Sequence, residues 1–173
     1  MNRRDFETLL LTLESTPALL AQAAADLGPS NARRRPSEGA FSFVENVWHL
    51  ADLEREGYGL RIRRLLAENE PALVNFDGDR LARERNYQDR DAERGLALFA
   101  HARAQNLEIL RNLSASDWKR FGALEGVGRV DLSDMVRLMA DHDRSHSADI
   151  ACIRAVLRGE EPCENDRPTS AVA

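Results

Sequence analysis

Glycine and proline, the residues that interrupt helices, gather in a few short stretches of this chain and leave four long stretches between them. Ala, Leu, Arg and Glu, all good helix formers, dominate the long stretches. These stretches predict helices over residues 4–27, 42–67, 91–113 and 131–158. Four long helices joined by one or two long connections are typical of a four-helix bundle. We therefore predict an all-α fold, more than half helical, with essentially no sheet.

Single residues predict where these helices begin, bend and end. Pro17 removes a backbone donor and is expected to kink or split the first helix, which Gly28 then stops. Ser42 and Glu45 fit a capping box at the start of the second helix. Residues 68–89 are predicted to form a long crossover loop with a helical turn at 80–83, and 114–130 a connection containing three glycines.

Length, charge and cysteine content narrow the class of protein. The 173 residues fit one domain, which we place at residues 1–158, followed by a polar and mobile tail at 159–173. A net charge of −5 argues against nucleic-acid binding, and no apolar run approaches the roughly 20 residues of a membrane span. Cys152 and Cys163 are too few for a disulfide framework, so a reduced, cytoplasmic setting is expected.

Two of the four histidines share one face of the last predicted helix. His142 and His146 are four residues apart, so their rings point the same way from adjacent turns, on a stripe that also carries Met139 and Ile150. This is the spacing by which one helix presents two imidazoles to a metal ion. The alternative is a pair of core histidines satisfied by hydrogen bonds. Two buried imidazoles on an apolar stripe are costly, which favours the metal site.

The helical faces of the remaining histidines and of one arginine predict their surroundings. His49 lies between an apolar and a polar strip of its helix, so it is either a surface residue or a third ligand, with Asp52 as a carboxylate that could fix its ring tautomer. His101 is predicted to face solvent. Arg103 lies on an apolar face, where it either pairs with a buried carboxylate, such as Asp52 or Asp149, or binds an anion.

Two segments carry a family resemblance. FSFVENVWHLADLE (41–54) and GRVDLSDMVRLMADHDRSHSADI (128–150) resemble the histidine motifs of the DinB-like bacterial four-helix-bundle metalloproteins. The resemblance implies an up-up-down-down topology, homodimers and a divalent metal, zinc or alternatively nickel, held by His49, His142 and His146. It also implies a transferase that uses a low-molecular-weight thiol such as bacillithiol, mycothiol or glutathione.

Several functions stay open at this point. Three imidazoles would leave one position of a zinc ion open, the arrangement of a catalytic site. A thiol or a water molecule could be activated there, giving a thiol transferase or a hydrolase acting on a small molecule. A metal-binding or ligand-binding protein without enzymatic activity is the third alternative. Apolar residues outside the principal stripes further predict a two-fold homodimer; they are Val44, Trp48, Ile62 and Leu66.

Overall fold

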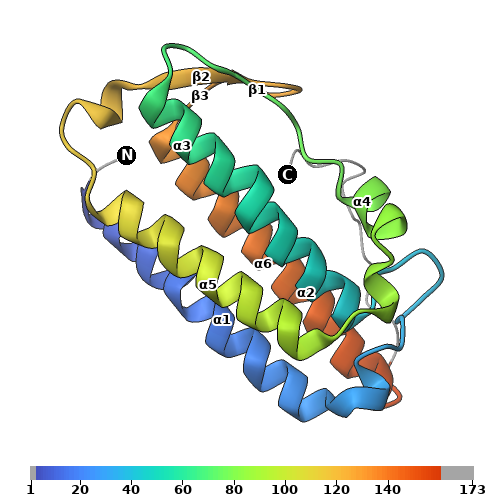
Figure 1. Ribbon diagram of the computed structural model, residues 1–173. Coiled ribbons are helices and arrows are strands. Elements are labelled where there is room, and N and C mark those ends of the chain that lie inside the picture. Colours follow the sequence, from blue (N-terminus) through green and yellow to red (C-terminus); the bar gives the residue numbers. More distant parts are fainter. Residues whose placement is uncertain (1–2, 161–173) are drawn as a thin grey trace.

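A computed structural model describes residues 3–160, and four long helical rods form its body (Figure 1). The first rod is α1 (Arg3–Asn31). The second is continuous through α2 (Phe43–Asp52), a π-helical segment η1 (Leu53–Tyr58) and α3 (Gly59–Ala67). The others are α5 (Ala92–Arg111) and α6 (Leu132–Leu157). The four-helix bundle predicted from the sequence is confirmed.

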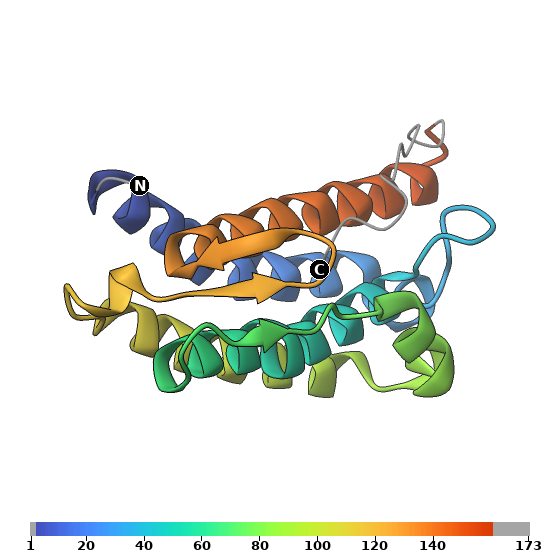
Figure 2. The ribbon, with the colours of Figure 1, turned by 90° about the horizontal axis from the view of Figure 1, so that it is seen from above.

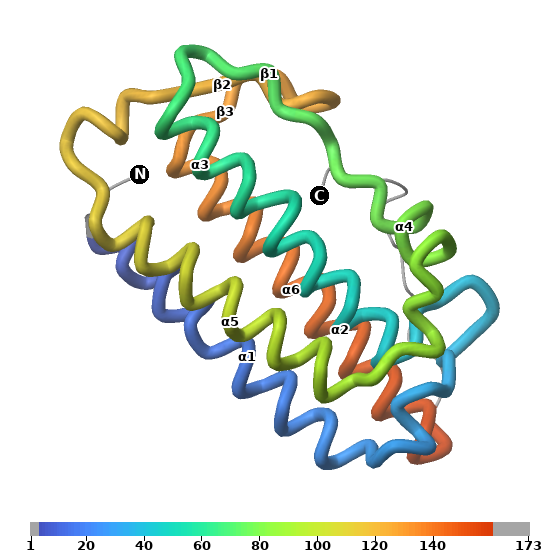
Figure 3. Tube along the Cα trace, viewed as in Figure 1, coloured from blue at the N-terminus to red at the C-terminus, as the bar shows by residue number. Residues whose placement is uncertain are grey.

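The helix directions follow from contacts between their ends. Asp26 and Arg154, both near the ends of their helices, form an ion pair of 2.6 Å, so α1 and α6 run the same way. Trp48 Nε1 donates to the carbonyl oxygen of Asp91 at 2.9 Å, which brings the starts of α2 and α5 together. The tube in Figure 3 shows that α2 and α5 run opposite to α1 and α6. The order is therefore up-down-down-up, which differs from the up-up-down-down order that the resemblance implied.

The helix starts match the local sequence. Ser42 and Glu45 form the predicted capping box at α2, and Asp131 with Asp134 forms a second one at α6. Of the kink or split expected at Pro17, the split is absent, since α1 continues past this residue. The backbone leaves helical angles only at Gly28, where φ is +69°, a conformation that glycine adopts without steric cost.

The two long connections contain short elements. Residues 68–91 hold β1 (Ala72–Leu73), α4 (Gly78–Glu84) and a 3₁₀ turn, η2 (Tyr87–Asp89). Residues 112–131 hold a second 3₁₀ turn, η3 (Asp117–Lys119), then β2 (Phe121–Leu124) and β3 (Gly128–Asp131).

The three strands form one small sheet that the sequence analysis did not predict. β2 lies in the middle, parallel to β1 and antiparallel to β3. Gly126 and Gly128 both have positive φ and make the tight turn between β2 and β3 possible. The sheet lies along one side of the bundle near α3 and the start of α6 (Figure 2). Strands this short give little periodic signal in a sequence.

The apolar core consists of two clusters. One lies toward the sheet and includes Leu13, Leu107 and Met139; the other lies toward the opposite end and includes Leu20 and Phe99. On α1, α5 and α6, buried polar residues separate the two clusters along the helix. The candidate site therefore lies in a polar layer inside the bundle, between two apolar halves.

The structure removes the sequence argument for a dimer. Val44, Trp48 and Ile62 are at most 4% exposed, because other elements of the same chain cover them. Leu66 packs against the core from a partly buried position.

Of the predicted tail, residues 161–173 lie outside the part of the chain that the structure describes. Within the described part, no helix is both long and apolar enough to span a membrane.

Candidate metal centre

Three of the four histidines meet inside the bundle. His49 comes from α2, and His142 and His146 come from successive turns of α6. The Nε2 atom of His142 lies 3.2 Å from that of His49 and 3.1 Å from that of His146. One nitrogen from each ring therefore points into a common centre, and the nitrogens all lie within 4.8 Å of one another.

Asn46 fixes the orientation of His146. This asparagine is fully buried, and its Nδ2 donates to the carbonyl oxygen of Ser42 at 2.9 Å. Its Oδ1 is then the acceptor that lies 2.6 Å from Nδ1 of His146. Nδ1 must therefore carry the ring proton, which leaves a lone pair on Nε2, directed at the centre.

His142 is held in its neutral form. Its ring is half-buried, and burial together with the nearby positive charges of Arg103 and Arg61 lowers its pKa to about 4. A ring with that pKa is uncharged at neutral pH. A neutral imidazole with an available lone pair is the form that coordinates a metal ion.

His49 is packed from several sides. It is 6% exposed, and the rings of Phe41 and Phe76 lie 5.8 and 5.9 Å from its own, centroid to centroid. Gly78, the first residue of α4, lies against the ring edge that carries Nδ1. A Cβ atom at this position would lie 2.4 Å from Nδ1 and 2.2 Å from Cε1. The glycine is therefore required for the loop to approach His49 this closely.

Two of the three separations between the ring nitrogens fit a tetrahedral divalent ion. With metal–nitrogen bonds of about 2.0–2.1 Å, two tetrahedral ligand atoms are separated by roughly 3.3 Å, close to the 3.1 and 3.2 Å observed. Hydrogen bonding alone satisfies this geometry poorly. His142 Nε2 can give one proton at most, so it cannot donate to both neighbours, and His146 Nε2 has no proton to give. A cation at the centre would satisfy all three lone pairs.

Two of the other predicted residues take different positions. His101 is exposed on α5, as predicted, and lies outside the centre. Asp52 is buried, but its carboxylate accepts hydrogen bonds from Tyr87 at 2.7 Å, Arg85 at 2.5 Å and Arg55 at 3.2 Å. These partners come from the crossover segment and from its own helix. The expected role of Asp52 as the carboxylate that orients His49 is not supported.

Arg103 is buried as predicted, but its partners were predicted wrongly. Its guanidinium binds Asp143 and Glu54 instead of Asp52 or Asp149, with nitrogen–oxygen distances of 2.7–2.9 Å. Two carboxylates already surround its charge. The interpretation as an anion-binding group is therefore not supported, and the alternative of a buried ion pair is confirmed.

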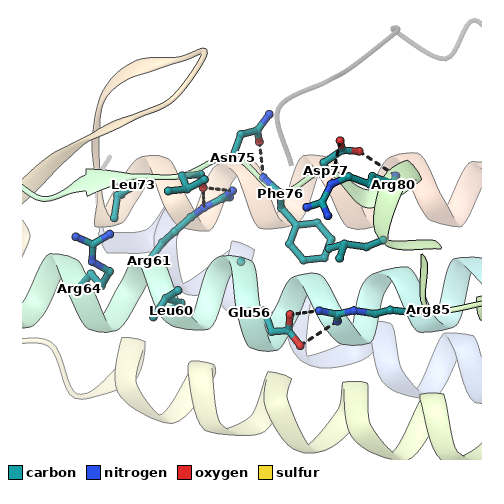
Figure 4. Close-up of a pocket in the computed structure, with 13 residues that line it drawn as sticks. Glu56, Leu60, Arg61, Arg64, Leu73, Asn75, Phe76, Asp77, Arg80 and Arg85 are labelled. Carbon is teal, nitrogen blue, oxygen red and sulfur yellow. Dashed lines mark hydrogen bonds and ion pairs between the residues drawn. The ribbon is translucent and has the colours of Figure 1, made fainter. Parts of the chain in front are cut away.

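A cavity lies beside the centre, between the second helical rod and the crossover segment. It has a volume of about 280 Å³ and is lined by apolar side chains, by the acidic residues Glu56 and Asp77, and by four arginines: Arg61, Arg64, Arg80 and Arg85. Figure 4 shows Phe76 reaching from the crossover segment into this region. Because Phe76 also packs edge-on against the His49 ring, it is shared by the cavity wall and the histidine centre.

Sequence reasoning missed Asn46 and Gly78. Asn46 stands three residues before His49, within the motif that carried the resemblance, so a helical-face argument could have placed it beside the ligands. Gly78 lies in the segment that the sequence predicts to be a long crossover loop. Nothing in the local sequence shows that a distant histidine packs on it.

The fold and the three histidines define the class of the protein: a four-helix bundle with an internal centre of the kind that holds a metal ion. A model of the DinB superfamily matches residues 12–150, and the chain belongs to this superfamily.

Named relatives agree with this assignment. A Bacillus licheniformis protein named "Putative metal-dependent hydrolase" is 26% identical over 154 residues, covering 88% of this chain and 87% of the relative. The Bacillus subtilis protein YfiT, with the same description, is 27% identical over 151 residues, covering 87% and 84%. A solved structure described as "YfiT from Bacillus subtilis is a probable metal-dependent hydrolase with an unusual four-helix bundle topology" superimposes with a TM-score of 0.83 over 93% of this chain and 91% of that one, at 23% identity. The fold is therefore shared with that structure.

Proposed function

We propose that this chain binds one divalent metal ion through His49, His142 and His146 and uses it in hydrolysis. The observation that carries the proposal is the convergence of three Nε2 atoms, two of their separations being 3.1 and 3.2 Å. Zinc is the expected ion because it prefers three imidazoles in a tetrahedral site with one open position, and nickel is the alternative.

When bound, such an ion supplies Lewis acidity to a water molecule or a thiol at its open position. The chain contributes ligand orientation and a dry surrounding. Asn46 holds the proton of His146 on Nδ1, and burial keeps His142 uncharged. Phe41 and Phe76 place apolar rings beside His49. These features preorganise the three histidine side chains for a cation.

Hydrolysis is favoured by the names of the relatives, which describe metal-dependent hydrolases. Thiol transfer is the second candidate. The observation in its favour is the cavity next to Phe76, which is large enough to admit a small thiol. The arginines Arg64, Arg80 and Arg85 that line it are paired with Glu68, Glu84 and Glu56, so they are not available for the carboxylates of such a thiol. Arg103, which the sequence suggested for this task, is instead held by Glu54 and Asp143.

Metal content tests the first part of the proposal. Elemental analysis of the purified protein should give about one divalent ion per chain, and His142→Ala and His146→Ala should lose it. His101→Ala is the matched control, because this histidine is exposed and outside the centre. Full metal occupancy in both α6 variants would refute the site.

The reaction is tested on metal-loaded and metal-free protein side by side. One assay supplies nitrophenyl esters and amides in the absence of thiol. The other supplies bacillithiol, mycothiol or glutathione with chlorodinitrobenzene. Metal-dependent turnover in the first assay alone supports hydrolysis, and turnover in the second alone supports thiol transfer. If neither rate exceeds that of the metal-free protein while the metal is bound, the protein is a metal-binding protein without either activity.

A further inference from the structure

A buried ion cluster lies beside the histidine centre and connects all four rods of the bundle. Arg103 of α5 is 1% exposed. Its Nη1 donates to Asp143 Oδ2 at 2.7 Å and to the carbonyl oxygen of Leu13 at 2.9 Å. Its Nη2 donates to Asp143 Oδ1 and to Glu54 Oε2, both at 2.9 Å. The guanidinium therefore binds the Asp143 carboxylate in a bidentate manner, through both terminal nitrogens.

Two further side chains complete this group, which we call the Arg103 cluster (Thr16, Glu54, Arg103, Asn106 and Asp143). Thr16 of α1 donates to Asp143 Oδ2 at 2.6 Å. Asn106 donates to Glu54 Oε1 at 2.8 Å and to the Glu54 carbonyl oxygen at 2.9 Å, inside the π-helical segment. Both carboxylates are thus held by several donors.

The place of the cluster in the sequence links it to the ligands. Asp143 directly follows His142, and Glu54 stands five residues after His49. Arg103 therefore binds the two rods that carry the histidines, from a third rod that carries none of them. A change in how Arg103 holds Asp143 would rotate or slide α6 relative to α2.

Stability alone is a weak reason for such a cluster. Removing charges from water costs several kcal/mol per ion, and well-packed apolar residues in their place are often equally or more stabilising. Apolar contacts do not fix the relative orientation of two helices in this way. A bidentate guanidinium–carboxylate pair does, because it fixes the angle and the distance between its two groups together. The effect of the cluster is therefore expected in the geometry of the bundle.

We propose that Arg103 is a positioning residue that binds Asp143 and Glu54 and so sets the rotation and the axial position of α6 relative to α2. These two quantities determine the spacing of the three Nε2 atoms. This inference rests on the proposed metal site. It assigns a role to a buried cation that is not one of the proposed ligands.

The test separates geometry from stability. One variant replaces the ions by apolar residues (Arg103→Met, Glu54→Leu, Asp143→Leu), and a second, Arg103→Lys, keeps the charge but loses the planar fork. We measure the thermal unfolding of the metal-free proteins, the Co²⁺ dissociation constant and the visible spectrum of bound Co²⁺. The triple variant should unfold at the same or a higher temperature. In both variants the Co²⁺ dissociation constant should rise by about tenfold or more, with shifted Co²⁺ absorption bands.

Leu110→Ala is the matched control, because Leu110 is a buried residue of the same helix in the apolar cluster toward the sheet. It should lower the unfolding temperature and leave the Co²⁺ spectrum unchanged. A folded Arg103 variant with the wild-type dissociation constant and spectrum would overturn the inference. Failure of both Arg103 variants to fold would also overturn it, since the cluster would then serve the fold and not the site. If the wild-type protein binds no Co²⁺, the proposed function itself fails.

Discussion

Replacing Gly78 by alanine should displace His49 and weaken metal binding. The added Cβ would lie 2.2 Å from Cε1 of the His49 ring, whereas carbon atoms in contact are separated by about 3.5 Å. The ring or the loop must therefore move by roughly 1.3 Å, which far exceeds the ~0.2 Å tolerance of a metal–ligand distance. Gly78 has no positive φ, so alanine is compatible with the backbone and the effect is purely steric.

Metal titration of the folded variant measures this effect. We expect the dissociation constant to rise by about 10–100-fold, with a loss of unfolding free energy of about 1–3 kcal/mol from overpacking. Gly95→Ala is the matched control, because its Cβ would lie 2.8 Å from Val47 and touch the core without meeting His49. It should cost stability and leave the metal affinity intact. A Gly78→Ala protein with wild-type affinity would refute the packing argument.

Two further predictions concern the ligands themselves. Asn46→Ala removes the acceptor of the His146 Nδ1 proton, so the metal dissociation constant should rise by about 10–100-fold; isothermal titration would contradict this if the affinity were unchanged. His142 has its pKa lowered to about 4, below the ordinary value of about 6.5, so between these pH values the unfolded chain binds a proton that the folded chain does not. The metal-free protein should therefore lose up to about 3 kcal/mol of unfolding free energy between pH 7 and pH 4, and denaturant titrations should show a smaller loss for His142→Gln.

The architecture could be predicted from the sequence because its signals are local. Helix formers, the Ser42 cap and the glycine at position 28 act within a few residues of where they stand. The small sheet gave no such signal, because its strands have only two to four residues and β1 pairs with β2 across about 50 positions of the chain, Ala72 with Ala123. The π-helical segment was also missed. Asn106, from another helix, donates to a carbonyl oxygen within it, and that contact cannot be seen in the sequence of residues 53–58.

The candidate site could likewise be predicted only in part from the sequence. His142 and His146 share a helix, so their common direction follows from helical geometry, whereas the place of His49 came from the family resemblance. The partners of Arg103 could not be predicted, because several acidic residues were compatible with its face. Only the packing of the helices decides that Asp143 and Glu54, not Asp52, come within reach.

The histidines of the centre come from distant parts of the chain, since His49 and His142 are 93 residues apart. A metal ion bound between them would act as a reversible cross-link that closes this long loop, as a disulfide would in an oxidising compartment. The ligand set is complete only when α6 has docked on α2, because α6 supplies two of the three histidines. A bound ion would therefore stabilise the docked state of α6 against its separation from the rest of the bundle.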